Sequence, residues 1–249
     1  MMGGEVKAVK HHLAAKDLCK RYGAKTVVHS VSLDVYSGEC VGVLGANGAG
    51  KTTSFYMVCG LVEANGGQVT LDGEDMVHLP MHLRARRGIG YLPQEASIFR
   101  KLTVRENLLA IFETLKMSAI QVEEELEALL VDFGLEAVQH QKAFTLSGGQ
   151  RRRTEIARAL VTHPQFLLLD EPFAGVDPIA VEDIQGIIAD LRSKGIGILI
   201  TDHNVRDTLV ICDRAYLMSA GEILVQGTAD EIVSHPDARR LYFGESFSM

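Results

Sequence analysis

Residues 45–53 contain the chemistry-bearing pattern around which the sequence is organised. They read Gly-Ala-Asn-Gly-Ala-Gly-Lys-Thr-Thr and match the phosphate-binding motif G-x-x-x-x-G-K-[ST] without a gap. Glycines allow backbone N–H groups to turn inward around a phosphate, and a helix that begins here directs its free amides at the same anion. A glycine-rich turn without a ligand is the alternative for this motif taken alone.

The residue types in this loop predict a site for a nucleoside triphosphate and Mg²⁺. Lys51 is expected to reach the β- and γ-phosphates, and the hydroxyl of Thr52 is expected to be a ligand of Mg²⁺. The apolar run at residues 40–44 and the helical pattern at residues 52–61 supply the strand and the helix that flank such a loop. The predicted nucleotide-binding residues of the loop are Gly45, Asn47, Gly48, Gly50, Lys51, Thr52 and Thr53.

A pair of carboxylates follows a second apolar run, residues 166–169. We expect Asp170 to hold the water shell of Mg²⁺ and Glu171 to orient or deprotonate the water that attacks the phosphate. An acidic turn before Pro172 without a catalytic role is the alternative. The presence of the phosphate-binding loop in the same chain argues against that alternative.

A second helix N-terminus suited to an anion lies at residues 146–150, which read Leu-Ser-Gly-Gly-Gln. Ser147 is a favourable N-cap residue, and Gly148 and Gly149 permit a ligand to approach the backbone closely. Three arginines follow at residues 151–153, where each cation opposes the helix dipole by roughly 0.3 to 1 kcal/mol. Their placement indicates either nearby negative charge or an exposed helix face.

The composition excludes several classes of protein. The 249 residues carry a net charge of −7, which argues against broad binding to nucleic acid or to an anionic membrane. The four cysteines are scattered, so neither a disulfide framework nor a zinc site is predicted, and a reducing cytosol is the expected compartment. No apolar run reaches the roughly 18 residues that a membrane-spanning helix needs. Any function at a membrane therefore requires another subunit.

Apolar patterns predict an α/β fold with a parallel core sheet. Residues 166–169 and 196–200 are unbroken apolar runs joined by a helical segment at 179–194, an order that favours parallel strands buried on both faces. Residues 95–162 read as helices, with capping boxes that begin at Thr103 and Ser118. A helical insertion within an α/β domain is therefore expected. The other expected strands lie within residues 12–35, 68–71, 89–92, 215–219 and 222–225.

Together the phosphate loop, the acidic pair and residues 146–150 resemble the nucleotide-binding subunits of ABC transporters, and the resemblance covers nearly all of the chain. In that family two copies enclose two ATP molecules head to tail, so the resemblance implies a homodimer with ATP and Mg²⁺ as cofactors. Ser147, Gly148, Gly149 and Gln150 would then face the nucleotide held by the second copy.

The resemblance also implies the organisation of the domain: a RecA-like parallel core sheet, an antiparallel β subdomain and an inserted α-helical subdomain. The ATP-binding core with the β subdomain is expected at about residues 12–94 and 163–235, and the helical subdomain at about 95–162. A C-terminal tail is expected at about residues 236–249. All 249 residues would thus form a single nucleotide-binding domain.

The same resemblance assigns four further site residues. Tyr22 would stack on the adenine, and Gln94 would sense both Mg²⁺ and the attacking water. Asp177 would cross the dimer interface, and His203 would contact the γ-phosphate. The alternatives are an ordinary packing role for Tyr22 and a surface position without function for His203.

Within the family, residues 84–100, 170–178 and 201–206, together with the ending around residues 244–247, resemble the ATPases of lipopolysaccharide export. This resemblance implies a peripheral subunit on the cytoplasmic face of the inner membrane. Its partners would be two integral-membrane permease subunits that extract lipopolysaccharide for delivery to the outer membrane.

In that family, residues just after Gln94 line the groove that receives a helix of the membrane subunit, and we expect Phe99 and Arg100 to lie there. Core packing within the helical insertion is the alternative for Phe99. Two other functions stay open: an ATPase of branched-chain amino-acid import, and a soluble ABC ATPase of the iron–sulfur assembly type. Co-purification with permease subunits or with a soluble assembly complex would distinguish them.

Overall fold

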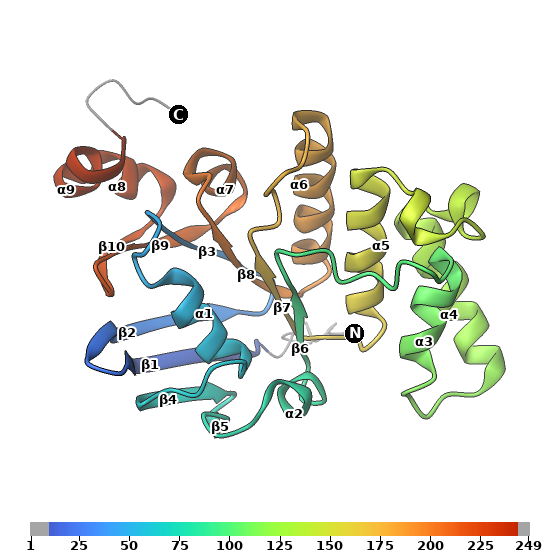
Figure 1. Ribbon diagram of the computed structural model, residues 1–249, viewed down its shortest axis with the longest axis horizontal. Helices are drawn as coiled ribbons and strands as arrows, with labels where there is room; N and C mark the ends of the chain where they lie inside the picture. Colours follow the sequence, from blue (N-terminus) through green and yellow to red (C-terminus); the bar gives the residue numbers. More distant parts are fainter. Residues whose placement is uncertain (1–9, 244–249) are drawn as a thin grey trace, which may run out of the picture.

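Two β-sheets form the framework of the structure (Figure 1). The computed structural model describes residues 10–243, and within them one sheet has four strands in the order β2-β1-β4-β5. The other has six described strands in the order β10-β9-β3-β8-β7-β6. The strands are β1 (His12–Tyr22), β2 (Lys25–Tyr36), β3 (Cys40–Gly45), β4 (Gly66–Leu71), β5 (Glu74–Asp75), β6 (Ile89–Leu92), β7 (Phe166–Asp170), β8 (Gly197–Asp202), β9 (Arg214–Ser219) and β10 (Glu222–Gly227).

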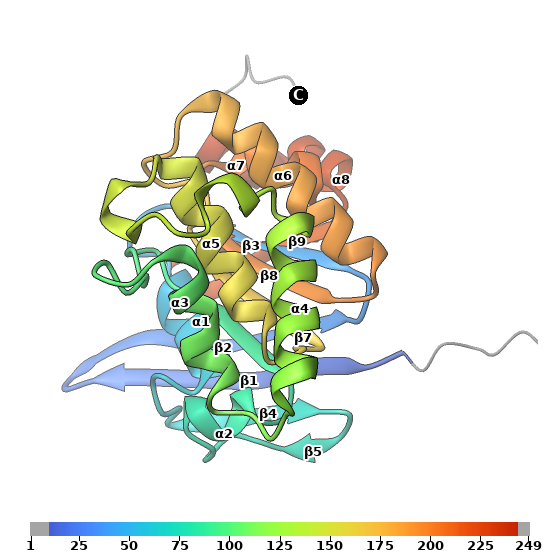
Figure 2. The ribbon, with the colours of Figure 1, turned by 90° about the vertical axis from the view of Figure 1, so that its right-hand side faces the viewer.

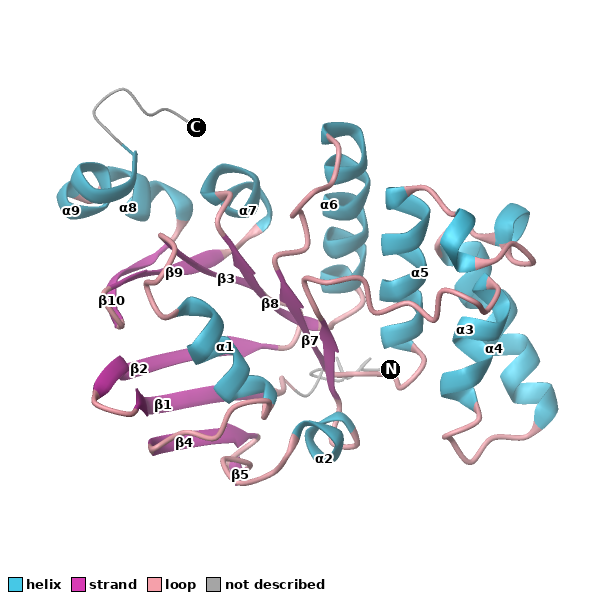
Figure 3. Ribbon diagram, viewed as in Figure 1, coloured by secondary structure: helices cyan, strands magenta, loops and turns pink. Residues whose placement is uncertain are grey.

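Helices cover these sheets and extend beyond the edge of the larger one (Figure 3). The α-helices are α1 (Lys51–Cys59), α2 (Met81–Ala85), α3 (Val104–Phe112), α4 (Ala119–Asp132), α5 (Gly148–Leu160), α6 (Pro178–Ser193), α7 (Val205–Ile211), α8 (Ala229–Ser234) and α9 (Pro236–Ala238). The short helical turns are η1 (Glu136–Val138), η2 (Ala143–Thr145) and η3 (Arg239–Phe243).

The predicted parallel core sheet is confirmed. Strands β6, β7, β8, β3 and β9 run parallel, and β10 returns antiparallel to β9. Every residue of β7 and β8 is buried, as expected for strands that are covered on both faces. Leu167 and Leu169 face a cluster shared with α5 and α6, whereas Phe166 and Leu168 face a cluster shared with α1 and the antiparallel sheet.

The helices predicted between residues 95 and 162 are α3, α4 and α5. Figure 2 shows α3 and α4 as the outermost layer, lying beyond α5 on the side away from the sheet. The capping boxes at Thr103 and Ser118 are both present, and Gly134 ends α4 with a φ of +58°. The subdomain boundaries near residues 94 and 162 stay a prediction.

Helix α1 is shorter than the pattern of residues 52–61 predicts. It ends at Cys59 because Gly60 adopts a left-handed conformation with a φ of +79°. The guanidinium of Arg84 is fully buried beneath this end and donates hydrogen bonds to the carbonyl oxygens of Met57 and Val58 at 2.8 and 2.6 Å. A cation at a helix C-terminus satisfies free carbonyls and complements the helix dipole.

No helix among residues 10–243 combines the length and apolar character needed to cross a bilayer. The expected C-terminal tail begins with α9 and η3. Residues 244–247, which contributed to the finer family resemblance, lie outside the described residues.

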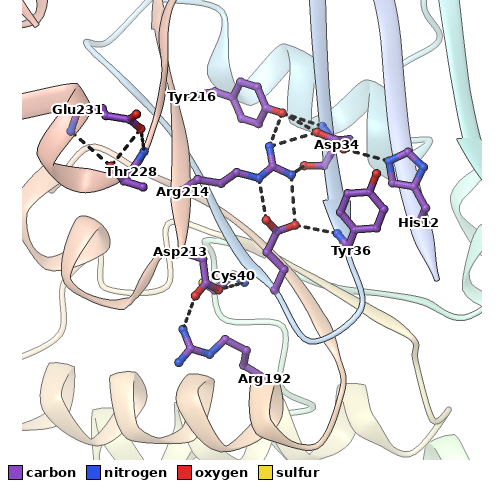
Figure 4. Close-up of polar contacts among 11 residues, drawn as sticks. His12, Asp34, Tyr36, Cys40, Arg192, Asp213, Arg214, Tyr216, Thr228 and Glu231 are labelled. Atoms are coloured by element: carbon purple, nitrogen blue, oxygen red, sulfur yellow. Dashed lines mark hydrogen bonds and ion pairs between the residues drawn. The ribbon is translucent and has the colours of Figure 1, made fainter. Parts of the chain in front are cut away.

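Arg214, at the start of β9, joins the two sheets through a network of hydrogen bonds (Figure 4). Its Nε and Nη2 atoms donate to the two carboxylate oxygens of Glu39 at 2.7 and 3.1 Å. Nη2 also donates to the carbonyl of Asp34 on β2 at 2.8 Å, and Nη1 donates to the Tyr216 hydroxyl at 2.6 Å. The Tyr216 hydroxyl in turn donates to the Asp34 carboxylate, so one guanidinium holds β2 against β9.

The protonation of Asp34 is linked to the stability of this junction. Burial alone would raise the pKa of Asp34, but hydrogen bonds from Tyr216 and His12 and the charge of Arg214 bring it below the ordinary value of 3.8. Burial and the Asp34 carboxylate raise the pKa of Tyr216 to about 12. Because folding lowers the pKa of Asp34, its stabilising contribution is present above the unfolded pKa and is lost as the pH falls through the folded one.

Replacing Arg214 tests this junction. Arg214→Gln is expected to lower the free energy of unfolding by about 1 to 3 kcal/mol, because it removes a charged donor from partly buried carboxylates. Urea unfolding at neutral pH measures this loss, and the difference from the unaltered protein should shrink in acid as Asp34 becomes protonated. Arg240→Gln, which removes an exposed ion pair with Asp237, is the control and should change stability by less than about 0.5 kcal/mol. Equal losses in the two variants would contradict the assigned role of Arg214.

Candidate functional site

Four loops meet at one edge of the six-stranded sheet because the strands that precede them are parallel neighbours. The loops follow β3, β8, β7 and β6, which lie next to one another in that order. In the register of the sheet, Leu44 pairs with Asp202, and Thr201 pairs with Asp170. The carboxyl ends of adjacent parallel strands form the usual ligand-binding edge of an α/β sheet. The phosphate loop, the acidic pair, Gln94 and His203 are thereby brought together.

The phosphate loop presents backbone donors at the start of α1. No side chain caps Gly50, so the first-turn N–H groups are directed at whatever binds in front of the helix. Gly50 has a φ of +98°, and a Cβ atom there would lie 2.9 Å from the carbonyl oxygen of Val27. Only glycine fits this position, because both the conformation and the space exclude a side chain.

Backbone carbonyl groups of the phosphate loop hold the side chain of Lys51 over that loop. Its side chain is 5% exposed, and Nζ donates to the carbonyl oxygens of Gly45 and Ala46 at 2.7 and 3.1 Å. Burial lowers the pKa of Lys51, while the carboxylates of Glu171, Asp202 and Asp170 oppose that effect. A compact, partly desolvated ammonium in this position is suited to the phosphates of a nucleotide.

A pocket of about 250 Å³ lies in front of the phosphate loop. Its lining residues are Lys25, Val27, Asn47, Gly48, Ala49, Gly50, Lys51, Thr52, Thr53 and Glu171. Tyr22 pairs with Lys25 across the β1–β2 hairpin and is 51% exposed, so it stands beside the pocket rather than in the core. Its exposure disfavours a place in the core, and the Lys20 ammonium lies 5.2 Å from the centre of its ring. Stacking of Tyr22 on the adenine stays a prediction.

Glu171 is oriented by two partners from neighbouring loops. Gln94 donates through Nε2 to the Oε2 atom of Glu171 at 2.6 Å, and Nδ1 of His203 lies 3.1 Å from the same oxygen. The backbone of Glu171 has a φ of +43°, a left-handed conformation that is rare for residues other than glycine. Strain of this kind gathers at functional sites, where the surrounding structure fixes a side chain in one direction.

Asp170 is suited to a hard cation. Its side chain is 2% exposed, and Oδ1 accepts a hydrogen bond from the hydroxyl of Thr201 at 2.7 Å. Its Oδ2 atom is buried and has no hydrogen-bond partner of ordinary length among the described residues, although the Asp170 carboxylate lies close enough to the Tyr56 hydroxyl to help burial raise the pKa of Tyr56. A buried carboxylate oxygen without a partner is rare, and Mg²⁺ or its bound water would satisfy it. The exposed hydroxyl of Thr52 supplies a second oxygen ligand of the type that Mg²⁺ prefers.

The helix start at residues 147–150 has the predicted N-cap. The Ser147 hydroxyl accepts from the Gln150 amide at 3.2 Å, and the Gln150 side chain accepts from the Ser147 amide at 3.0 Å. A Cβ atom at Gly148 would meet nothing within 4 Å, and one at Gly149 would meet Ala180 at 3.5 Å, so the helix end is open to a ligand. The pocket beside this helix start shares no lining residue with the phosphate-loop pocket. A ligand can therefore approach this helix end from outside the chain.

Three other expected site residues occupy exposed positions. Asp177 caps α6, where its carboxylate accepts from the amide of Ala180 at 3.1 Å. Phe99 is 46% exposed and lines a separate pocket of about 260 Å³, with the guanidinium of Arg158 4.9 Å from its ring centre. Core packing is therefore wrong for Phe99. Arg100 is exposed beside this pocket but does not line it.

Several residues near the site were missed by sequence reasoning. Lys25 and Thr201 carry no local signal, because the chain fold alone brings them to the phosphate loop and to Asp170. For Arg152 the exposed-face alternative is wrong, since its side chain is 7% exposed. A signal existed in the spacing: Arg152 precedes Ile156 by four residues and so shares its buried helix face.

Comparisons with known proteins agree with this geometry. The family model for ABC transporters matches residues 28–174, which is more than half of the chain. The lipopolysaccharide export system ATP-binding protein LptB of Haemophilus influenzae is 55% identical over 238 residues, covering 95% of this chain and 99% of that protein. A probable ABC transporter ATP-binding protein of Azorhizobium caulinodans is 56% identical over 237 residues, covering 95% and 84% of the two chains. The ADP conformation of MJ1267, an ATP-binding cassette of an ABC transporter, matches with a TM-score of 0.84 at 30% identity, covering 94% and 99% of the two chains.

Removing the Lys51 ammonium tests the phosphate loop. Lys51→Ala is expected to weaken ATP binding by about 10- to 100-fold, the effect of one charge-assisted hydrogen bond. Equilibrium titration with a fluorescent ATP analogue measures the affinity. Lys194→Ala, which removes a surface ion pair with Asp132, is the matched control and should bind ATP normally. Normal affinity in Lys51→Ala would remove Lys51 from the site.

Replacing the Glu171 carboxylate by an amide tests its role as a base. Glu171→Gln is expected to slow ATP hydrolysis by about 10²- to 10⁴-fold, the range for loss of a general base. ATP affinity should stay unchanged, because the amide has the same shape and Lys51 is untouched. Phosphate release in a single turnover separates hydrolysis from binding. Unchanged turnover would assign proton transfer to another group.

Proposed function

Since the chain belongs to the ABC transporter family and is one of its ATP-hydrolysing subunits, we propose that it powers the export of lipopolysaccharide. The observation that carries this proposal is the 55% identity to the Haemophilus influenzae LptB protein along 95% of this chain and 99% of that one. The matched segment takes in nearly all of both chains, so it extends well beyond the loops of the nucleotide site.

Hydrolysis uses the loops at the carboxyl edge of the sheet. Residues 45–53 bind the triphosphate through their N–H groups and the Lys51 ammonium. Glu171 takes a proton from the attacking water, while Gln94 and His203 hold its carboxylate in place. Thr52, Asp170 and Gln94 would hold Mg²⁺, which would supply positive charge against the phosphates of the nucleotide.

Two copies of the chain act together. The helix start at residues 147–150 of one copy meets the nucleotide bound to residues 45–53 of the other, and Asp177 lies at the contact between the copies. The open start of α5 supports this arrangement, because a side chain at Gly148 would meet nothing within 4 Å and a nucleotide held by a second copy can approach it. ATP closes the dimer because ATP binds the closed form more tightly than the open form. The closed form binds ADP less tightly than ATP, so hydrolysis lets the dimer open.

The partners are two integral-membrane permease subunits, and the subunit lies on the cytoplasmic face of the inner membrane. The pocket lined by Phe99 receives a helix of the permease, with Arg100 at its rim. The exposed aromatic ring of Phe99 supports this role, since exposed aromatic residues are common anchors of protein interfaces. Closure of the dimer moves this pocket and thereby the permeases.

Neither alternative function has comparable support. An importer of branched-chain amino acids and a soluble iron–sulfur assembly ATPase share the nucleotide site, so the site geometry does not distinguish them. The near-complete coverage of an LptB protein favours export. Gentle extraction from the membrane supplies the test: export requires co-purification with two permeases and a lipid-binding β-domain, and a soluble assembly complex would overturn it.

Truncating Phe99 tests whether the pocket that it lines binds the permease. Phe99→Ala is expected to reduce permease association at least tenfold, the effect of losing one well-buried aromatic anchor of about 1.5 to 4 kcal/mol. Its intrinsic ATP hydrolysis should be unchanged, because Phe99 does not line the nucleotide pocket. Pull-down against the permeases measures the association.

Ile120→Ala is the control for this experiment. Ile120 is also an exposed apolar residue, but it lies on α4, outside the groove. Its truncation should leave permease association unchanged. Equal association of Phe99→Ala and the unaltered protein would place the permease elsewhere.

A further inference from the structure

Arg152 connects the helix that begins at Ser147 to the loop that carries Gln94. It lies in the second turn of α5 with its side chain turned inward. Its Nη1 atom donates to the carbonyl oxygen of Pro93 at 3.0 Å, directly before Gln94. A buried guanidinium contacting a backbone carbonyl fixes the distance between the two segments.

Glu155 holds the other end of the same loop. It lies one turn further along α5, is 2% exposed, and accepts through Oε1 from the amides of Ser97 and Ile98 at 2.7 and 3.1 Å. Its Oε2 atom lies 3.3 Å from Nη1 of Arg152. Burial lowers the pKa of Arg152, whereas the Glu155 carboxylate opposes this effect. The loop of residues 93–98 is thus attached to α5 at both ends.

The attachment leads to the catalytic carboxylate. Gln94 lies between the two attachment points and donates to Glu171 at 2.6 Å. A displacement of α5 therefore moves the Pro93 carbonyl, then Gln94, and then the Glu171 carboxylate that Gln94 orients. The path consists of two hydrogen bonds of ordinary length, joined by the peptide bond between Pro93 and Gln94.

The structure leaves room for such a displacement. The Nε and Nη2 atoms of Arg152 are buried and have no partner among the described residues. A pocket of about 120 Å³ lies beside them, lined by Gln94, Gly148, Glu155 and residues 174–176. Buried donors without partners are costly, so an arrangement that satisfies them is favoured. The helix is therefore not locked by a fully satisfied interface on this side.

We propose that Arg152 is a positioning residue that couples the two ATP sites of the dimer. This inference rests on the proposed dimer, in which α5 of one copy meets the nucleotide of its partner while Gln94 serves the nucleotide of its own copy. ATP bound by the partner moves α5, and Arg152 transmits that movement to Gln94 and Glu171. Hydrolysis at one site consequently depends on occupancy of the other, which is positive cooperativity.

Steady-state hydrolysis as a function of ATP concentration tests the coupling. For two coupled sites the Hill coefficient has an upper limit of about two, and in Arg152→Gln it is expected to fall to about one. ATP affinity of the isolated sites, measured with a fluorescent analogue, should change less than about twofold, since Arg152 does not line the phosphate-loop pocket. Arg152→Lys keeps a cation that can reach the Pro93 carbonyl and should restore part of the cooperativity.

Arg153→Gln is the matched control. Arg153 lies on the same helix but donates to the carbonyl of Phe133 in the helical region, so its removal should preserve the Hill coefficient. Glu155→Gln provides a second measurement, because weaker attachment should speed hydrogen exchange at the Ser97 and Ile98 amides at least several-fold. An unchanged Hill coefficient in folded Arg152→Gln, or unchanged exchange in Glu155→Gln, would overturn the proposal.

The failure of the inference and the failure of the proposed dimer are distinguishable. In a Glu171→Gln background, ATP and Mg²⁺ should give dimers both with and without Arg152→Gln, as measured by light scattering. If both variants dimerise, and Arg152→Gln with Glu171 intact hydrolyses ATP with unchanged cooperativity, the proposed dimer is supported and the coupling role of Arg152 is wrong. If neither variant dimerises, the proposed dimer itself is wrong, whatever the role of Arg152.

Discussion

The parallel pairing of β3, β8, β7 and β6 is the constraint on which the nucleotide site depends. Hydrogen bonding between these strands places their carboxyl ends in one line, with Leu44 opposite Asp202 and Thr201 opposite Asp170. No loop by itself contains a catalytic arrangement. The phosphate loop supplies donors, the acidic pair supplies carboxylates, and Gln94 and His203 supply orientation. Only the register of the sheet brings these groups to one edge, where Gln94 and His203 contact Glu171. The buried apolar residues of β7 and β8 stabilise the sheet that carries the site.

Features that depend on neighbouring residues in the sequence could be predicted from it. The predicted capping boxes at Thr103 and Ser118 and the predicted N-cap at Ser147 are present, and the fold class and the ABC transporter family are confirmed. Local preference is sufficient here, because a cap is decided within one helical turn. The end of α1 was predicted two residues too late, since the left-handed conformation of Gly60 and the buried Arg84 beneath it outweigh the helical pattern.

Features that depend on distant contacts could not be predicted in the same way. Arg152 follows a helix N-terminus, where a cation opposes the dipole, and a surface position was the simplest interpretation. The structure supplies the compensation from two other segments: the Glu155 carboxylate and the Pro93 carbonyl. Arg214 is similar, since Glu39 and Asp34 are more than 170 residues away from it in the chain. Sequence spacing carries no information about partners at such separation, so these residues emerge only from the fold.

The left-handed backbone conformation of Glu171 lowers the stability of the fold, but hydrolysis needs the carboxylate at this position. Glycine or asparagine would relax that conformation and gain on the order of 1 kcal/mol of stability, yet either would abolish the carboxylate. A search of variants for heat resistance alone would therefore tend to recover inactive proteins altered at this one position. The unfavourable backbone conformation is retained because the residues that adopt it readily, glycine and asparagine, have no carboxylate to act as a base at this point.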